Sequence, residues 1–252
     1  MRLPGITQQI ERLIQEEGLR NVDIVTDELN GIEKAKVSHW SFILNSLPKE
    51  ELPKLVYKDF EILPGVNSLI GDVTAYLTPI LPILHIEDVE GNPTVHKMRE
   101  NFKELSNEMQ IEGPHQPLLQ HPYKYKACCA MYSLDEMWYR GFVLEELPDK
   151  MMLVQYVDYG NVEVVPASCV RELREEWIDV EVQGILCTLH NVDRSEYFCD
   201  RELLDALEDC LQQGTVKANI IERKPDLSVE LLINERLAYQ KLIDMAMFSY
   251  ID

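Results

Sequence analysis

Between residues 123 and 170 the chain repeats a short pattern, in which an apolar segment is followed by residues that favour a turn. Strands this short, separated at regular intervals by turn signals, are typical of a small antiparallel barrel. The sequence therefore predicts such a barrel in this region. The four segments are YKYKACCAMY, WYRGFVLEEL, KMMLVQYVDY and NVEVVPASCV.

The segments on either side of this region alternate between strand and helix patterns, which predicts a second, mixed unit that surrounds the barrel. Pro225-Asp226 marks a hairpin turn, and Gly113-Pro114 ends the long helix that precedes the barrel. The predicted elements are strands at 73–77, 80–89, 182–192, 215–224 and 227–233, and helices at 94–111, 199–214 and 234–248.

Residues 1 to about 66 carry a helical pattern without a recognisable motif. Apolar residues fall on one face over 7–18, where Thr7 is a suitable N-cap and Gly18 a suitable stop. A second helix is predicted over 36–47, before Pro48.

The charge balance narrows the classes of partner. Lysine and arginine total 24 against 44 aspartate and glutamate, so the formal net charge is −20. Phosphate binding depends on basic side chains, so this balance opposes nucleic acid, and it favours basic partners such as arginine-rich peptides. The negative net charge could also do no more than keep the protein soluble, without any role in binding.

The chain has no apolar run of the roughly 18 residues that cross a bilayer, and no signal-peptide core at its start. We therefore expect a soluble intracellular protein. Six cysteines are present without a CxxC pair or zinc-finger spacing. This pattern favours reduced, mostly buried thiols.

Aromatic side chains are concentrated in the predicted barrel. Trp138 and Tyr139 are neighbours on one strand and point to opposite faces, so we place Trp138 in the barrel core and Tyr139 outside it. Gly160 tolerates positive φ, so the turn can bring Tyr159 beside Tyr156. Tyr132 lies in the loop before Trp138, near the same mouth.

Aromatic faces that converge in this way can enclose a cation, at about 0.5–2 kcal/mol for each good contact. A methylated guanidinium suits such a cage, because methylation keeps the charge, removes donors and adds apolar surface. Asn161 could accept a hydrogen bond from a remaining N–H group. Asp158 adds negative potential or simply pins the turn, and Arg140 is expected to pair with a neighbouring acid.

These residues resemble the Tudor core of extended Tudor domains. The resemblance covers about residues 68 to 252. The matching run extends from Cys129-Ala130 through Tyr132, Asp135 and Trp138-Tyr139-Arg140 to Tyr156-Val157-Asp158-Tyr159-Gly160-Asn161.

The resemblance implies an α+β fold, in which a Tudor-type antiparallel β-barrel is inserted in an OB-like, staphylococcal-nuclease-like subdomain. The expected domains are a helical N-terminal segment of unknown role over 1–67 and an extended Tudor domain over 68–252. Within the latter, the first part of the nuclease-like subdomain and a linker helix cover 68–121. The barrel then covers 122–176, and the second part of the subdomain covers 177–252.

The resemblance also implies a function. The cage would consist of Tyr132, Tyr139, Tyr156 and Tyr159, with Asn161 as polar ligand residue and Asp158 in support. The expected ligand is symmetrically dimethylated arginine in Arg-Gly or Arg-Ala segments, such as the tails of PIWI proteins. That role belongs to RNA-mediated gene silencing by the piRNA pathway, in the cytoplasm and its perinuclear germ granules. The chain would be a non-catalytic reader without cofactor or metal.

Four other interpretations stay open at this stage. The chain could be a scaffold that grips a peptide independently of methylation, and a methyl-lysine reader is a variant of the cage hypothesis. A nuclease-like subdomain could also cleave nucleic acid, although no compact set of metal-binding carboxylates and basic residues is evident and the charge opposes it. Finally, tyrosines are common in strands and could be no more than packing residues.

Overall fold

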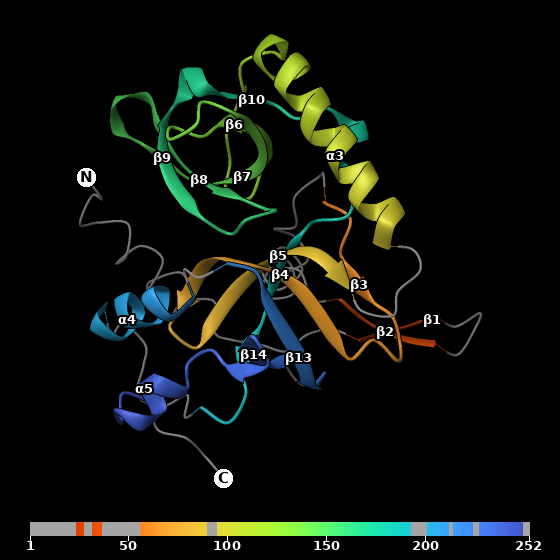
Figure 1. Ribbon diagram of the computed structural model, residues 1–252. Helices are drawn as coiled ribbons and strands as arrows, with labels where there is room; N and C mark the ends of the chain where they lie inside the picture. Colours follow the sequence, from red (N-terminus) through yellow and green to blue (C-terminus); the bar gives the residue numbers. More distant parts are fainter. Residues whose placement is uncertain are drawn as a thin grey trace.

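The computed structural model describes residues 56–89, 95–192, 201–211, 214–223 and 227–248, and the backbone of two short strands nearer the N-terminus. Figure 1 shows a small barrel above a larger sheet, with one long helix beside the barrel. The fold is mostly antiparallel β-structure with a few helices. Among the described residues, no helix is long and apolar enough to cross a membrane.

The barrel predicted from the repeating pattern is confirmed. It is an antiparallel five-stranded sheet in the order β10-β6-β7-β8-β9. Short 3-10 turns link its later strands, η3 at Pro148–Lys150 and η4 at Ala167–Cys169. The strands are β6 (Ala127–Met131), β7 (Trp138–Leu147), β8 (Met151–Tyr156), β9 (Val162–Pro166) and β10 (Val170–Glu172).

The larger sheet has seven strands, and its main path runs β11-β5-β4-β13-β14-β12, with β15 paired to β14. All its pairs are antiparallel except β12 with β14. The strands are β4 (Ser68–Thr78), β5 (Leu81–Val89), β11 (Gly184–Leu186), β12 (Thr188–Leu189), β13 (Val216–Glu222), β14 (Ser228–Ile233) and β15 (Arg236–Leu237).

The barrel is inserted between β5 and β11, which pair with each other in the larger sheet, Gly184 opposite His85. The predicted insertion of the barrel within a second subdomain is therefore confirmed. Helix α4 (Arg201–Leu211) covers this subdomain with Leu203, Leu207 and Leu211, which recur at four-residue steps and join its core. A short helix, α5 (Gln240–Asp244), follows β15.

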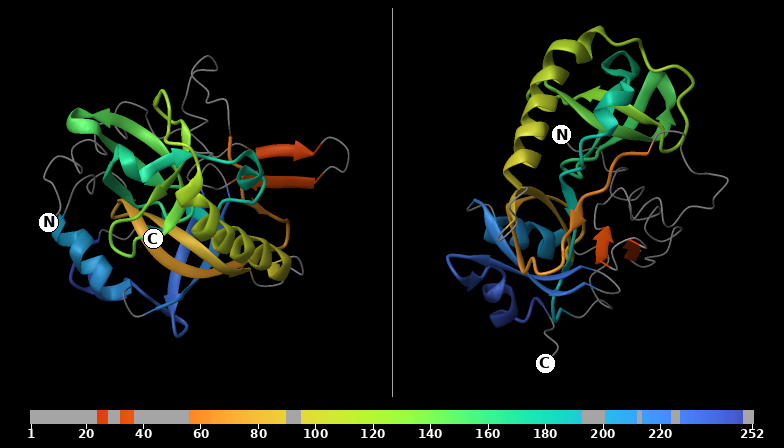
Figure 2. Two further views of the ribbon diagram at one scale, coloured as in Figure 1. Left: turned by 90° about the horizontal axis from the view of Figure 1, so that it is seen from above. Right: turned by 90° about the vertical axis from the view of Figure 1, so that its right-hand side faces the viewer.

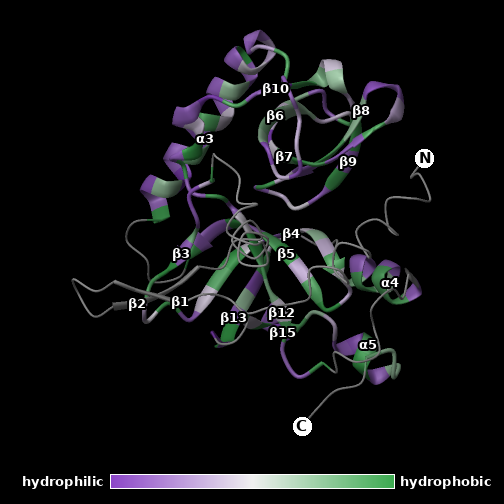
Figure 3. Ribbon diagram, turned by 180° about the vertical axis from the view of Figure 1, so that it is seen from behind, coloured by the Kyte–Doolittle hydropathy of each residue, from purple (hydrophilic) through white to green (hydrophobic). Residues whose placement is uncertain are grey.

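Helix α3 (Val95–Glu112) contacts both β5 and β7, and Figure 2 shows it running beside the barrel down to the larger sheet. Its outer side is largely hydrophilic (Figure 3), whereas Leu105 and Met109 are buried against the barrel. Gln110 fixes the start of β7: its amide oxygen accepts from the Trp138 backbone N–H at 2.7 Å, and its Nε2 donates to the Trp138 carbonyl at 2.8 Å.

The packing of α3 against the barrel shows that one prediction, the placing of Trp138 in the barrel core, is wrong. Trp138 is buried, but it packs outside the barrel in the same cluster as Leu105 and Met109 of α3. The Cβ of an alanine at Gly113 would lie only 3.0 Å from the Trp138 Cβ. Its neighbour Tyr139 instead packs against the cluster to which all five barrel strands contribute. The two side chains do point to opposite faces, but the assignment of inside and outside was reversed.

The N-terminal region contains strands where only helices were predicted. Strands β1 (Ile24–Asp27), β2 (Ile32–Lys36) and β3 (Glu61–Ile62) form an antiparallel three-stranded sheet. The helices predicted over 7–18 and 36–47 lie outside the described residues, except for Lys36, which ends β2.

The helix predicted over 234–248 is replaced by β15 and the short α5. The cause is local, because Asn234 and Glu235 both have positive φ, 51° and 61°. Two such residues make the tight turn that joins antiparallel strands, and here they bring Arg236 opposite Ile233. The predicted hairpin of β13 and β14 is confirmed by their antiparallel pairing, whereas its turn at Pro225-Asp226 lies outside the described residues.

Candidate functional site

The four tyrosines singled out in the sequence meet at one end of the barrel. Tyr132 follows β6, Tyr139 is the second residue of β7, Tyr156 ends β8, and Tyr159 lies in the turn before β9. The ring centroids of Tyr139 lie 6.4 Å from Tyr132, 5.9 Å from Tyr156 and 5.4 Å from Tyr159. Those of Tyr132 and Tyr156 are 5.4 Å apart.

The ring planes are arranged as the walls of a box. Tyr132, Tyr139 and Tyr156 are mutually close to perpendicular, with interplanar angles of 77°, 80° and 81°. Tyr159 is perpendicular to Tyr139 at 82°. In such edge-to-face packing the positive edge of one ring lies against the negative face of the next, and the Tyr156 side chain is almost wholly buried. A cluster of aromatic rings of this kind has the chemistry that attracts a compact, weakly hydrated cation.

Two carboxylates accept hydrogen bonds from the hydroxyl groups of two of the tyrosines. Tyr139 donates to Asp135 Oδ2 at 2.7 Å, and Tyr156 donates to Glu163 Oε2 and to the Met131 carbonyl, each at 3.2 Å. These bonds fix the orientation of both rings. Neither acid was assigned to the site from the sequence, because the positions of acids along the chain do not show which hydroxyl groups they reach.

The phenols of Tyr139, Tyr156 and Tyr159 stay protonated at neutral pH. Burial, and then the hydrogen bond to Asp135, raise the pKa of Tyr139 well above its ordinary value. Burial, and then the charge of Glu163, do the same for the pKa of Tyr156. For Tyr159, burial followed by nearby carboxylates raises the pKa to about 12. The rings are therefore neutral, and the negative charge at the rim resides on the carboxylates.

The turn after β8 depends on glycine. Gly160 has a φ of +79°, and a Cβ there would lie 2.3 Å from Ile83 Cδ1 of the larger sheet. Its carbonyl accepts from Gln155 Nε2 at 2.8 Å, and its N–H donates to the Tyr156 carbonyl at 2.7 Å. The positive φ predicted for Gly160 is confirmed, and close packing against β5 is a second reason for glycine.

Asn161 lies next in the chain, partly exposed beside the tyrosines. Its carbonyl accepts from the Tyr156 N–H at 3.0 Å, which fixes the backbone. Its side-chain amide makes no hydrogen bond within the part of the chain that the structure describes.

Asp158 pins the turn through its buried side chain. Its carboxylate is buried and accepts from Arg140, with Nη2–Oδ1 at 2.6 Å and Nε–Oδ2 at 3.0 Å. Its Oδ1 also accepts from the Gln183 N–H at 3.0 Å. The structure shows Asp158 pinning the turn, and its negative charge also contributes to the raised pKa of Tyr159. The expected pairing of Arg140 with an acid is confirmed.

The larger sheet supplies a support that sequence reasoning missed. His85 of β5 stacks on Tyr159, with centroids 4.4 Å apart and planes at 8°. Its Nδ1 lies 2.8 Å from the Asp158 carbonyl. Thr74 Oγ1 of β4 donates to the Tyr159 carbonyl at 2.6 Å. No local signal marks these residues, because they lie on strands far from the barrel in the sequence.

The described residues contain no group of three or more His, Cys, Asp or Glu side chains placed to hold a metal ion. The five cysteines within the described ranges are free thiols, and Cys199 lies outside them. Burial raises the pKa of the Cys128, Cys129 and Cys187 thiols well above the ordinary value. These thiols therefore act as small apolar groups in the core.

Comparison with known proteins agrees with this geometry. Residues 94–191 match the family model for the Tudor domain. The chain is 32% identical over 95 residues to human Tudor domain-containing protein 1, which covers 38% of this chain and 8% of that protein. The matched segment is thus a small part of a much longer relative.

Two solved structures share the fold. The extended Tudor domain TD3 of mouse TDRD1, in complex with a MILI peptide containing dimethylarginine, has a TM-score of 0.63 and 20% identity. The match covers 79% of this chain and 100% of that one. The human TDRD1 extended Tudor domain, in complex with a symmetrically dimethylated peptide, has a TM-score of 0.62 and 21% identity over 81% of this chain and 98% of that one.

The fold defines a class, a Tudor-type barrel inserted in a larger, mostly antiparallel β-subdomain. The chain contains a Tudor domain at residues 94–191, and its fold is similar to the extended Tudor domains of TDRD1 and Papi.

Proposed function

We propose that this chain is a non-catalytic reader, which binds symmetrically dimethylated arginine in Arg-Gly or Arg-Ala segments of a partner protein. The observation that carries the proposal is the convergence of four tyrosine rings, three of them mutually near perpendicular, at the mouth of the barrel. Asn161 stands beside them and would accept from a guanidinium N–H group.

The electrostatics of the site support a cationic ligand. The phenols are neutral, so each ring presents the negative face of its π-system. Asp135 and Glu163 hold negative charge at the rim, in a chain whose formal net charge is −20. A methylated guanidinium keeps its positive charge and loses little hydration on entering an apolar box, whereas an unmodified one loses more.

The relatives suggest the kind of partner. The two TDRD1 domains were solved with dimethylated peptides, that of the mouse protein from MILI, and the Tudor protein was solved in complex with Aubergine. By analogy, the tail of a PIWI protein is the proposed partner, with a role in the piRNA pathway and a location in the cytoplasm and its perinuclear germ granules.

Calorimetric titration tests the proposal with one Arg-Gly-rich peptide in three forms: unmodified, symmetrically dimethylated and asymmetrically dimethylated. We expect the symmetric form to bind most tightly. Tyr139→Leu should weaken that binding by about 3- to 30-fold, because it removes one cation–π contact but retains apolar volume.

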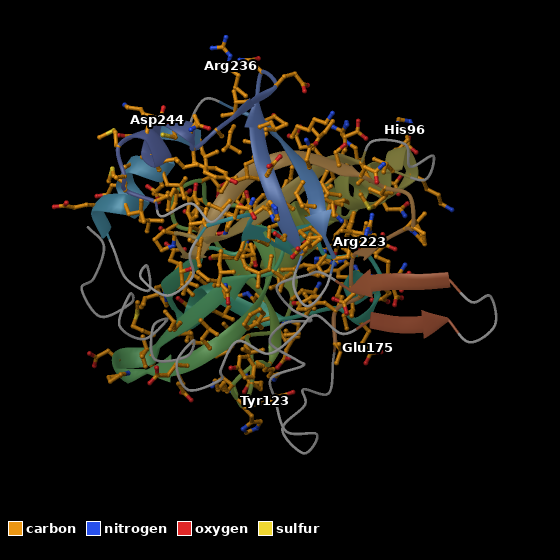
Figure 4. The ribbon with its side chains drawn as sticks, turned by 90° about the horizontal axis from the view of Figure 1, so that it is seen from below. His96, Tyr123, Glu175, Arg223, Arg236 and Asp244 are labelled. Carbon is orange, nitrogen blue, oxygen red and sulfur yellow. The ribbon has the colours of Figure 1, made fainter. Side chains whose placement is uncertain are left out.

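Tyr123→Leu is the matched control. Tyr123 is exposed and lies before β6, whereas Tyr132 lies after the opposite end of that strand. Figure 4 labels Tyr123 at the edge of the molecule. The control should bind like the unaltered chain. Equal binding of all three peptide forms would contradict the proposal and favour a scaffold that is indifferent to methylation.

A further inference from the structure

The loop between β6 and β7, residues 132–137, carries two apolar side chains to the surface at the edge of the tyrosine box. Leu134 is 81% exposed, the largest exposure among the large apolar side chains of the described residues, and Met137 is 40% exposed. A single exposed leucine is ordinary. Here two apolar residues lie on a short loop whose ends lead directly to Tyr132 and Tyr139.

This loop is held in place by several hydrogen bonds. The Tyr132 N–H donates to the Met137 carbonyl, and the Glu136 N–H donates to the Tyr132 carbonyl, both at 2.9 Å. Asp135 accepts from the Met137 N–H at 2.9 Å through Oδ1 and from the Tyr139 hydroxyl at 2.7 Å through Oδ2.

A further contact joins the loop to β9, because Ser133 donates through both its N–H and its hydroxyl to Glu163. Glu163 also holds the hydroxyl of Tyr156. Leu134 is therefore presented to solvent by a fixed loop that shares its hydrogen bonds with two walls of the box. An apolar surface fixed in this way can bind a side chain with little loss of conformational entropy in the protein.

We infer that Leu134 and Met137 form an apolar rim that binds an apolar side chain of the peptide, within two residues of the methylated arginine. The inference rests on the proposed function, since the arginine must first occupy the box. Successive Cα atoms of a peptide are about 3.8 Å apart, so residues next to the arginine lie within reach of a loop whose ends join Tyr132 and Tyr139.

The chemistry of the rim determines which residue it favours. Leucine offers aliphatic surface, and the flexible thioether chain of methionine adapts to several shapes, so leucine, methionine or an aromatic residue should all fit. Asp135 and Glu136 separate the two apolar residues and keep the rim attractive to a peptide that is basic elsewhere. The rim thus adds side-chain preference to a site that otherwise reads one modified arginine.

The test uses two symmetrically dimethylated peptides that differ only at the two positions on each side of the arginine, leucine in one and serine in the other. By calorimetry, the unaltered chain should bind the leucine peptide about fivefold more tightly, as expected for partial burial of one aliphatic side chain. Leu134→Gln and Met137→Gln should each reduce this preference, and together abolish it. Both should leave binding of the serine peptide within about twofold of the unaltered chain.

Met245→Gln is the matched control, because Met245 is also exposed but follows α5, at the end of the molecule away from the barrel (Figure 1). It should keep the full preference. Methylation-dependent binding without any preference for leucine, or a preference that survives the double variant, would overturn the rim alone. Failure of the unaltered chain to favour methylated over unmodified peptide would overturn the proposed function, and the rim with it.

Discussion

Arg140 and Asp158 form a buried, two-pronged ion pair directly behind the tyrosine box. Their side chains are 0% and 5% exposed, and Arg140 also donates to the carbonyl groups of Trp177, Val180 and Glu181. Arg140 follows Tyr139 in the chain, and Asp158 precedes Tyr159. One pair therefore fixes the backbone of two walls of the box and ties the barrel to the segment that returns to the larger sheet.

Loss of one partner of this pair should be strongly destabilising. Asp158→Ala leaves a buried guanidinium without its counter-charge, so we expect the free energy of unfolding to fall by about 3–5 kcal/mol in urea titrations. The exposed pair of Arg174 and Glu108, with side chains 33% and 46% exposed, is the control. Glu108→Gln should cost less than about 1 kcal/mol, and equal losses at the two sites would refute the argument.

The fold could be predicted where the signal is local. Short strands with turn residues between them identified the barrel, and the run around Tyr156 and Tyr159 identified the site. Which face of a strand points into the barrel was harder to predict. Alternation shows that the side chains of Trp138 and Tyr139 lie on opposite faces of the strand, but not which of them faces the barrel interior. The helix predicted near the C-terminus failed because Asn234 and Glu235 adopt a left-handed turn that periodicity does not reveal.

Gly160 should not tolerate a side chain. Gly160→Ala places a Cβ against Ile83 at a position of positive φ, so we expect a loss of about 1–3 kcal/mol beyond the conformational penalty. Gly65→Ala is the control, because Gly65 also has positive φ, +86°, but an added Cβ there meets nothing within 4 Å. The difference between the two thermal midpoints isolates the collision, and the absence of a difference would show that Ile83 moves aside freely.

The rings and the hydroxyl groups of the box should make separable contributions. Tyr156→Phe keeps the ring but removes the bonds to Met131 and Glu163, so stability should fall by about 1 kcal/mol. Binding of a dimethylarginine peptide should change by less than about threefold, since the cation–π face remains. A large loss of affinity with unchanged stability would assign the hydroxyl group a direct role in the ligand contact.

Stability should depend on alkaline pH through Tyr159. Burial, followed by the nearby negative charge of Asp158, raises the pKa of Tyr159 to about 12 from the ordinary 10.0. The folded state thus retains the phenol proton more tightly, and this stabilisation is complete below about pH 10 and is lost as the pH rises towards about 12. The urea midpoint should fall over that interval, and less steeply in Tyr159→Phe. Tyr123→Phe, which removes an exposed phenol, should follow the unaltered chain.

The support that the larger sheet gives to the box is testable at His85. Its ring stacks on Tyr159 at 4.4 Å, and its Nδ1 must carry the hydrogen, because the Asp158 carbonyl 2.8 Å away can only accept. His85→Ala removes both contacts, so Tyr159 should lose its fixed orientation and affinity for a dimethylarginine peptide should fall severalfold.

His85→Phe distinguishes the two contacts, because it keeps the stacked ring and loses only the hydrogen bond. If stacking orients Tyr159, His85→Phe should recover most of the affinity that His85→Ala loses, as measured by calorimetry on chains with matched thermal midpoints. If the hydrogen bond to the turn matters more, the two variants will bind equally poorly. Equal binding by His85→Ala and the unaltered chain would instead show that the barrel holds Tyr159 without help from β5.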